Sequence, residues 1–180
     1  TLVRGRICVG GGAASAARKG LTIAVDYANR RRQFRAPGLG EEVYLMDYLT
    51  HQRRLLPEVA RAYAYGFAQN ELALQLQRIT DVAGADPVAA RELETRAAGM
   101  KATLTRWAND TLQTCREACG GAGFMSDNGI TLARQDADIF ATFEGDNTVL
   151  LQLVGKRLLS DYANEFKNID AGGMARLVVE

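Results

Sequence analysis

One acidic residue of the sequence stands where a carboxylate could serve as a base. Glu144 directly follows Phe143, lies four residues after Phe140, and precedes the start of a predicted helix. The apolar rings would remove water from this carboxylate and make it a stronger base, whereas the positive end of the helix would stabilise the anion. The spacing does not decide which effect is larger, so removal of a substrate proton is a hypothesis for Glu144.

Two further segments could bind an anionic or flat ligand. Residues 30–35 contain four arginines, whose planar guanidinium groups match pairs of phosphate oxygens. Cations also stabilise the end of a helix, and basic runs are usually solvated, so composition alone favours the solvated interpretation. Residues 120–123 contain three glycines, more than a helix end requires. Glycine also lets a backbone approach a ligand, so a helix cap and a ligand site are equally open for this turn.

The remaining candidate groups are more easily explained by packing. Cys115 and Cys119 lie four residues apart on one helical face without a zinc-binding pattern, so we expect small buried side chains in a reducing cytosol and no metal site. His51 has no nucleophile near it in the sequence and is expected on a helix surface. Residues 10–12 are all glycine but lack the Gly-Lys-Ser/Thr ending of a phosphate loop, which favours close helix packing.

The length and composition of the chain indicate the class of protein that carries these residues. A chain of 180 residues with 47% hydrophobic and 24% charged residues is typical of one soluble globular domain. No stretch approaches the roughly 20 apolar residues of a membrane span. The net charge of +1 gives no basic field that would attract nucleic acid. Because the chain starts at Thr1 without a methionine, we expect a piece of a longer protein.

Apolar residues recur at helical spacing through most of the chain. Pro57 should kink or restart the second helix, Glu41 and Glu42 should lie at that helix's start, and Asp86-Pro87 is a typical helix start. The sequence therefore predicts an all-α fold, an antiparallel helical bundle of about four main helices, as one domain over residues 1–168. Residues 169–180 would be a tail that begins a linker to a missing domain. The expected helices cover residues 2–31, 43–79, 87–118, a short stretch at 130–133, and a fourth main helix from Asp146 or Asn147 to about 162.

Three segments together resemble a known family. Residues 27–34 (YANRRRQF), 115–124 (CREACGGAGF) and 138–148 (DIFATFEGDNT) are similar, in order and separation, to the C-terminal helical domain of acyl-CoA oxidases and dehydrogenases. The resemblance covers about residues 2–165. It implies FAD-dependent oxidation of a fatty acyl-CoA to trans-2-enoyl-CoA.

The resemblance also implies roles for single residues. Glu144 would remove the α-proton, its backbone N–H would help bind the thioester carbonyl, and the neighbouring Phe143 and Gly145 would contact substrate. The residues implied in FAD binding are Arg31, Gln33 and Phe34, which would reach the FAD of a neighbouring subunit, together with Gly120, Gly121 and Asp146.

Two departures from the dehydrogenase pattern are similar to oxidases. Glu117 stands where dehydrogenases usually have Gln, and residues 146–148 (DNT) replace their usual Glu-Gly-Thr. The resemblance thus implies an oxidase that passes electrons to O2 and forms H2O2. A dehydrogenase that uses an electron-transfer flavoprotein is the alternative within the family, and a non-catalytic helical oligomerisation module is the alternative outside it.

Further expectations follow from the family. The enzyme would be a homodimer or homotetramer without a nucleic-acid partner or a membrane span, in the cytoplasm of a bacterium or the peroxisome of a eukaryote. The family's other domains hold the flavin ring and much of the acyl-CoA, so we expect the isolated domain to be inactive.

Overall fold

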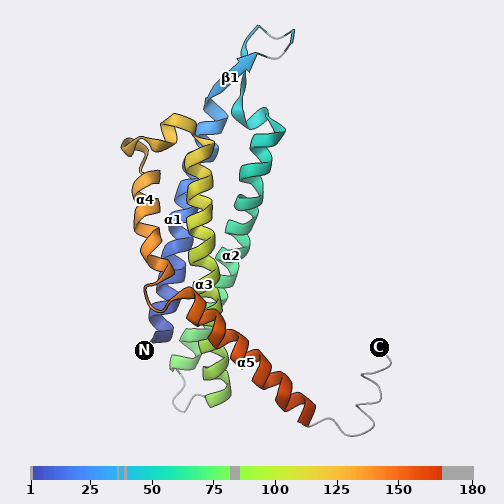
Figure 1. Cartoon of the computed structure of the whole chain (residues 1–180), viewed down its shortest axis with the longest axis vertical. Helices are drawn as coiled ribbons and strands as arrows, with labels where there is room; N and C mark the ends of the chain where they lie inside the picture. The colour runs from blue at the N-terminus through green and yellow to red at the C-terminus, as the bar shows by residue number, and fades with distance from the viewer. Residues whose placement is uncertain (1, 36, 39, 82–85, 168–180) are drawn as a thin grey trace, which may run out of the picture.

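The computed structural model describes residues 2–35, 37–38, 40–81 and 86–167. Three long helices lie side by side, each antiparallel to the one before it in the chain, and a short fourth helix lies beside them (Figure 1). This arrangement confirms the predicted all-α bundle. The α-helices are α1 (Leu2–Arg30), α2 (Leu49–Asp81), α3 (Pro87–Ala118), α4 (Ile130–Asp138) and α5 (Asn147–Lys167), with short 3-10 helices at Leu45–Asp47, Gly120–Phe124, Ser126–Asn128 and Ile139–Ala141.

Small residues let α1 and α3 pack closely through the centre of the bundle. The core side of α1 consists largely of alanine and glycine, and a Cβ added at Gly20 would lie 2.7 Å from a methyl group of Leu112. A Cβ added at Gly10 would lie 3.3 Å from a methyl group of Leu104, which confirms the packing role expected there. The same face carries the fully buried Ala13, Ala17, Ala24 and Ala28.

The predicted helix start at Asp86-Pro87 is confirmed, whereas the predicted restart at Pro57 is not. Asp86 caps α3, because its carboxylate accepts a hydrogen bond from the backbone N–H of Val88 at 2.9 Å, and Pro87 is the first helical residue. Pro57 does not restart α2, which continues through it from Leu49. A proline removes one backbone hydrogen bond, and the helix continues through this position despite that loss.

A two-stranded hairpin replaces the predicted start of the second helix. Strand β1 (Arg32–Arg35) pairs antiparallel with β2 (Glu42–Tyr44), so Glu42 opens a strand rather than a helix. The Arg32 guanidinium stabilises this pairing, because it lies 4.1 Å from the centre of the Tyr44 ring and donates to its hydroxyl at 2.7 Å. The hairpin extends beyond one end of the bundle (Figure 1).

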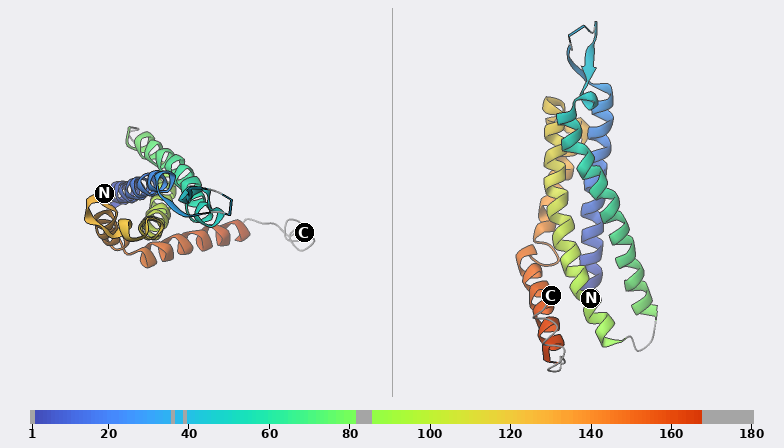
Figure 2. Two further views of the ribbon diagram at one scale, coloured as in Figure 1. Left: turned by 90° about the horizontal axis from the view of Figure 1, so that it is seen from above. Right: turned by 90° about the vertical axis from the view of Figure 1, so that its right-hand side faces the viewer.

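The helix predicted as the fourth member of the bundle leaves it instead. Asp146 caps α5 by accepting from the backbone N–H of Thr148 at 2.8 Å and of Val149 at 3.3 Å. The first half of α5 packs on α3 through Leu150. The helix then diverges from the bundle, as Figure 1 and the left-hand view in Figure 2 show.

Helix α4 lies along α1 and α3, and extends to Asp138, five residues beyond the predicted end. Within the described ranges, no helix has both the length and the hydrophobicity that crossing a membrane requires. The predicted tail over residues 169–180 lies outside the described residues, so the domain boundary at residue 168 stays a prediction.

Candidate functional site

The predicted site residues gather into two groups at opposite ends of the bundle. Phe143 to Asp146, here called the glutamate turn, lies against the first turns of α1. Arg31 directly follows the last residue of α1 and lines a cavity with Gly120 and Gly121. At about 1.5 Å of rise per helical residue, Gly5 beside the glutamate turn and Arg31 are about 39 Å apart. The structure therefore does not bring Glu144 together with Arg31.

An unusual backbone conformation places the Glu144 side chain. Glu144 has a φ of 58° and Gly145 a φ of 116°, so two successive residues adopt left-handed conformations. A non-glycine residue in this region is strained and persists only where its surroundings hold it. The carboxylate lies against Gly5 of α1, where an added Cβ would be 2.5 Å from both of its oxygens. The missing side chain at Gly5 thus makes room for the carboxylate.

The carboxylate of Glu144 is short of hydrogen-bond donors. Its Oε2 atom is buried and has no hydrogen-bond partner in the described part of the chain. The two rings expected beside it differ, because Phe140 packs partly buried against the core whereas Phe143 is 54% exposed. One oxygen of this carboxylate is thus left without a contact to any described donor.

A lysine that the sequence analysis did not single out lies under the glutamate turn. Lys101 of α3 is fully buried, and its ammonium donates to the carbonyl oxygens of Ala141 at 3.3 Å and Gly145 at 2.5 Å and to Oδ1 of Asn147 at 3.0 Å. Burial lowers the pKa of Lys101, and the nearby Asp146 carboxylate opposes this shift. The sequence feature that could have indicated the burial of Lys101 is its position four residues after Ala97, on the buried face of α3.

The second group lines a cavity at the other end of the molecule. This arginine–glycine cavity has a volume of about 570 Å³ and contains four of the predicted site residues, namely Arg31, Gln33, Gly120 and Gly121. Hydrogen bonds from Tyr48 Oη to the Gln33 carbonyl, at 2.6 Å, and from Leu45 N to the Arg31 carbonyl, at 2.9 Å, fix the chain there. The other lining residues are Tyr27, Leu45, His51, Glu117, Ala118, Cys119 and Ala122.

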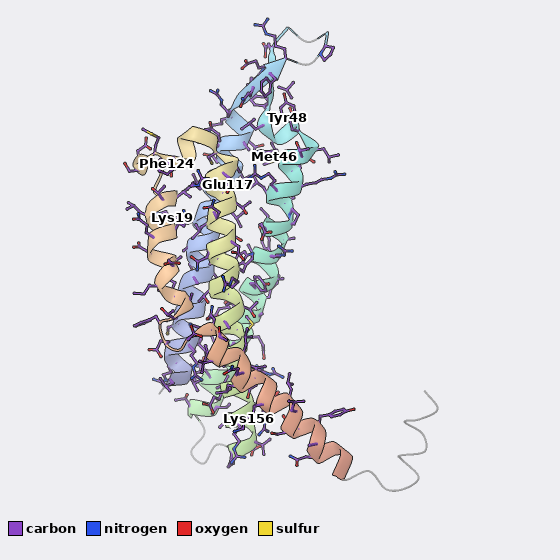
Figure 3. The ribbon with its side chains drawn as sticks, in the orientation of Figure 1. Lys19, Met46, Tyr48, Glu117, Phe124 and Lys156 are labelled. Atoms are coloured by element: carbon purple, nitrogen blue, oxygen red, sulfur yellow. The ribbon has the colours of Figure 1, made fainter. Side chains whose placement is uncertain are left out.

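The charges around the cavity leave one cation for a ligand. In the run of arginines, Arg30 pairs with Asp26 and Arg32 with Glu41. Arg31 has no ion pair or side-chain hydrogen bond to any other described residue, and it lines the cavity. The acidic Glu117 also lines the cavity. It lies near the C-terminal end of α3 and is labelled in Figure 3.

Glu117 does not oppose an anion with a free charge. Its carboxylate accepts from the Arg54 guanidinium at 2.9 Å and from the Gln113 amide at 2.5 Å. Because this acid is already paired, the unpaired guanidinium of Arg31 determines what the cavity attracts. The arrangement suits an anionic ligand.

The three glycines after α3 have different reasons to be glycine. Gly120 has a φ of 57° and ends the helix, and a Cβ at Gly123 would lie 2.9 Å from the backbone carbon of Arg116. Gly121 has neither a positive φ nor a described atom within 4 Å of where its Cβ would be. Folding therefore explains Gly120 and Gly123 but does not explain Gly121, whose contact with a ligand stays a prediction.

The last predicted cofactor residues lie outside the cavity. Phe34 stands on β1, is 69% exposed and has a φ of 62°. The Asp146 carboxylate caps α5 at the other end of the molecule. Their contacts with a cofactor stay predictions.

His51 and the cysteines complete the neighbourhood of the cavity. His51 is half-buried in the cavity wall rather than open on a helix surface, and its Nε2 atom has no partner among the described residues. Burial and the Arg54 cation lower the pKa of His51, which favours the neutral ring. Burial raises the pKa of Cys115 to about 12, so this thiol is inert as expected. The described ranges contain no group of three or more acidic, cysteine or histidine side chains that could hold a metal ion.

Comparisons with known proteins agree on one family. Residues 1–159 match the model of a family described as "Acyl-CoA oxidase, C-alpha1 domain". Peroxisomal acyl-coenzyme A oxidase 3 of Arabidopsis thaliana is 42% identical over 164 residues, which are 91% of this chain and 23% of that protein.

Two solved structures share the fold. The crystal structure of acyl-CoA oxidase 1 from Yarrowia lipolytica matches with a TM-score of 0.86 and 32% identity, over 96% of this chain and 27% of that one. Acyl-CoA oxidase-1 from Caenorhabditis elegans, crystallised with FAD and ATP, matches with a TM-score of 0.87 and 26% identity, over 96% and 27%. The chain thus spans about a quarter of the length of these relatives.

Proposed function

Because the chain belongs to the family of acyl-CoA oxidase C-alpha1 domains, we propose that it is one domain of an FAD-dependent enzyme that oxidises a fatty acyl-CoA. The product is trans-2-enoyl-CoA, and the electrons pass to O2, which forms H2O2. Within this enzyme the chain supplies the catalytic base, part of the FAD site and part of the oligomer interface. The observation that carries the proposal is the buried, donor-free oxygen of Glu144 on a strained turn.

Glu144 is the base of the proposed reaction. Its carboxylate removes the α-proton of the thioester, and the N–H of the same residue donates to the thioester carbonyl as negative charge develops there. The exposed ring of Phe143 and the backbone of Gly145 contact the acyl chain. FAD, when bound, accepts the β-hydrogen as hydride.

The arginine–glycine cavity fits the phosphate-bearing half of FAD. Arg31 offers the unpaired guanidinium that a pyrophosphate requires, and Gly121 offers an open backbone along which a flat group can lie. Gln33 supplies a polar side chain at the same wall, while Phe34 on the hairpin and Asp146 at the glutamate turn provide further contacts.

The separation of the two groups requires more than one copy of the chain. A single FAD is too short to reach from the cavity at one end of α1 to Glu144 at the other. The Arg31 group therefore serves a flavin whose reacting ring lies at the Glu144 of another subunit, in a homodimer or homotetramer. The Arabidopsis relative is named as peroxisomal, and a peroxisomal location is our proposal if this protein is eukaryotic.

Mixing the full-length protein with palmitoyl-CoA or butyryl-CoA without oxygen tests the proposal. We expect the flavin absorbance to bleach, and one H2O2 per enoyl-CoA to form when air is admitted. Reduced flavin that persists in air but is reoxidised by an electron-transfer flavoprotein would identify a dehydrogenase. If the protein contains no flavin, or if no acyl-CoA reduces its flavin, the result would favour the alternative of a non-catalytic helical oligomerisation module.

A further inference from the structure

We propose that Lys101 is the positioning residue that holds Glu144 where it can remove the substrate proton. The inference rests on the proposed function of Glu144 as the base. Lys101 acts on the segments that flank Glu144, because it donates to two backbone carbonyls and one side-chain oxygen there and not to the carboxylate itself.

The partners of Lys101 lie on both sides of the base. Ala141 ends the 3-10 helix three residues before Glu144, Gly145 follows Glu144 directly, and Asn147 is the first residue of α5. One ammonium group therefore ties together the segment that enters the turn and the segment that leaves it. Three acceptors match the three N–H groups of a protonated lysine, whereas a neutral amine has only two.

The turn needs such a support because its backbone is strained. Glu144 and Gly145 both have positive φ angles, and a glutamate would relax from this conformation if its surroundings allowed it. Lys101 fixes the turn to α3, a helix of 32 residues in the centre of the bundle. The base thereby takes its position from a long helix that packs against α1, α2, α4 and α5.

A second set of hydrogen bonds reinforces the same anchor. Asn147 donates from Nδ2 to the hydroxyl of Thr105 at 2.9 Å, and that hydroxyl donates to the Lys101 carbonyl at 2.9 Å. Thr105 is fully buried and Asn147 is 8% exposed, so these bonds are shielded from water. The start of α5 is thus attached to α3 at two consecutive turns.

A packing role alone does not account for a lysine here. Burying the charged ammonium group of Lys101 costs free energy, and no carboxylate in the described part of the chain lies within ion-pair distance to offset that cost. A leucine or methionine would fill the same space without that cost. The hydrogen bonds to the turn are what a hydrophobic side chain could not supply.

The test is a pre-steady-state measurement on the full-length, FAD-loaded enzyme. Lys101→Met keeps the length and apolar stem of the side chain and removes all three donors, and Lys101→Gln retains an N–H2 group. Lys19→Met is the matched control, since Lys19 is an exposed lysine on α1 (Figure 3). Anaerobic mixing with saturating palmitoyl-CoA gives two separate quantities, because the amplitude of bleaching counts folded flavin sites and the rate constant reports the placement of the base.

We expect Lys101→Met to lower the rate constant by about tenfold to a hundredfold at unchanged amplitude, with partial recovery in Lys101→Gln. The apparent affinity for palmitoyl-CoA and the Lys19→Met rate should stay at wild-type values. Hydrogen exchange of the amides in residues 142–147, measured without substrate, should accelerate in Lys101→Met only.

Three results would overturn the proposal. The first is a Lys101→Met rate constant within a factor of about two of wild type. The second is a loss confined to the amplitude of flavin bleaching. The third is that neither Lys101 variant can be isolated with FAD bound, which would show a role in the fold as a whole. Failure of the wild-type flavin to be reduced by any acyl-CoA would instead contradict the proposed function, and hydrogen exchange would still report whether Lys101 holds the turn.

Discussion

The position of the Glu144 carboxylate depends on a missing side chain and a missing hydrogen-bond donor among its neighbours. Gly5 contributes no side chain on the facing turn of α1, and no described donor occupies Oε2. Phe143 turns outward instead of covering the acid. The result is a half-buried glutamate whose Oε2 atom is buried and has no described donor.

Replacing Glu144 by glutamine tests the base directly. The amide retains the size of the side chain but cannot accept the α-proton, so we expect flavin reduction by acyl-CoA to slow by about 10⁴-fold or more while FAD content stays near wild type. Stopped-flow bleaching and the flavin-to-protein absorbance ratio check the two parts. A variant that reduces flavin at close to the wild-type rate would disprove the assignment.

Adding one methyl group at Gly5 should separate activity from stability. In Gly5→Ala the new Cβ would overlap the end of the Glu144 side chain, which can swing away, so the fold tolerates the change and the helix gains up to about 1 kcal/mol. The displaced carboxylate should reduce flavin about 10 to 100 times more slowly.

Gly155→Ala on α5 is the matched control, because no described atom lies within 4 Å of where its Cβ would be. We expect this control to keep the wild-type rate. Thermal melting and stopped-flow bleaching of both variants check the prediction, and a Gly5→Ala enzyme with full activity would show that the carboxylate does not act from the observed position.

Motifs in the sequence proposed Glu144, Arg31 and Gly121 as site residues, but they did not single out Lys101, and His51 was expected on a helix surface rather than in a cavity wall. A lysine within a helix normally indicates a solvated face, and only the packing of α3 against α5 shows that this one is enclosed. The hydrogen-bond partners of Lys101 lie 40 to 46 positions away in the sequence. Tertiary hydrogen bonding of this kind leaves no local pattern.

Among the elements, the helices were predictable because their signals are local. Asp86-Pro87 and Asp146 cap helices as predicted, and the glycines after α3 end it. The hairpin was not predictable, since its four-residue and three-residue strands show no alternation and depend on the contact between Arg32 and Tyr44 across the turn. The divergence of α5 from the bundle was likewise not predictable, because an amphipathic pattern does not indicate which element packs against the apolar face of the helix.

The glycine turn after α3 permits a test that separates folding from ligand binding. Gly123→Ala places a Cβ against the Arg116 carbonyl group, so we expect a loss of stability of about 1 to 3 kcal/mol. Gly121→Ala meets no described atom, so the apoprotein should melt at the wild-type temperature and bind FAD more weakly. Calorimetric melting and FAD titration of each apoprotein check both expectations, and equal FAD affinity in wild type and Gly121→Ala would remove Gly121 from the cofactor site.

At the scale of the whole molecule, the chain carries two half-sites about 39 Å apart, joined by α1. This separation could not be read from the sequence, where the motifs simply follow one another, because it depends on which end of an antiparallel bundle each motif reaches. Arg31 follows the last residue of α1, and Glu144 faces its beginning, after the chain has crossed the bundle three more times (Figure 1). If both groups serve a flavin as proposed, each complete site combines two copies of the chain.

Mixed oligomers provide the decisive test of this arrangement. Glu144→Gln removes the base, and Arg31→Ala removes the cation of the cavity, so each homodimer should be nearly inactive, the second with low FAD occupancy that excess FAD partly restores. In a mixed dimer, the intact Glu144 of one subunit meets the intact Arg31 of the other, which creates one wild-type site and one doubly altered site.

Refolding the two full-length variants together in equal amounts should give about half mixed dimers and hence about a quarter of wild-type activity. Refolding each variant alone and then combining them is the control, and it should stay nearly inactive as long as subunits do not exchange. If both residues served one flavin within a single chain, every site in the mixed dimer would carry one substitution and no activity would return. Peroxide formation from palmitoyl-CoA, measured against the fraction of mixed dimer after affinity-tag separation, distinguishes the two arrangements.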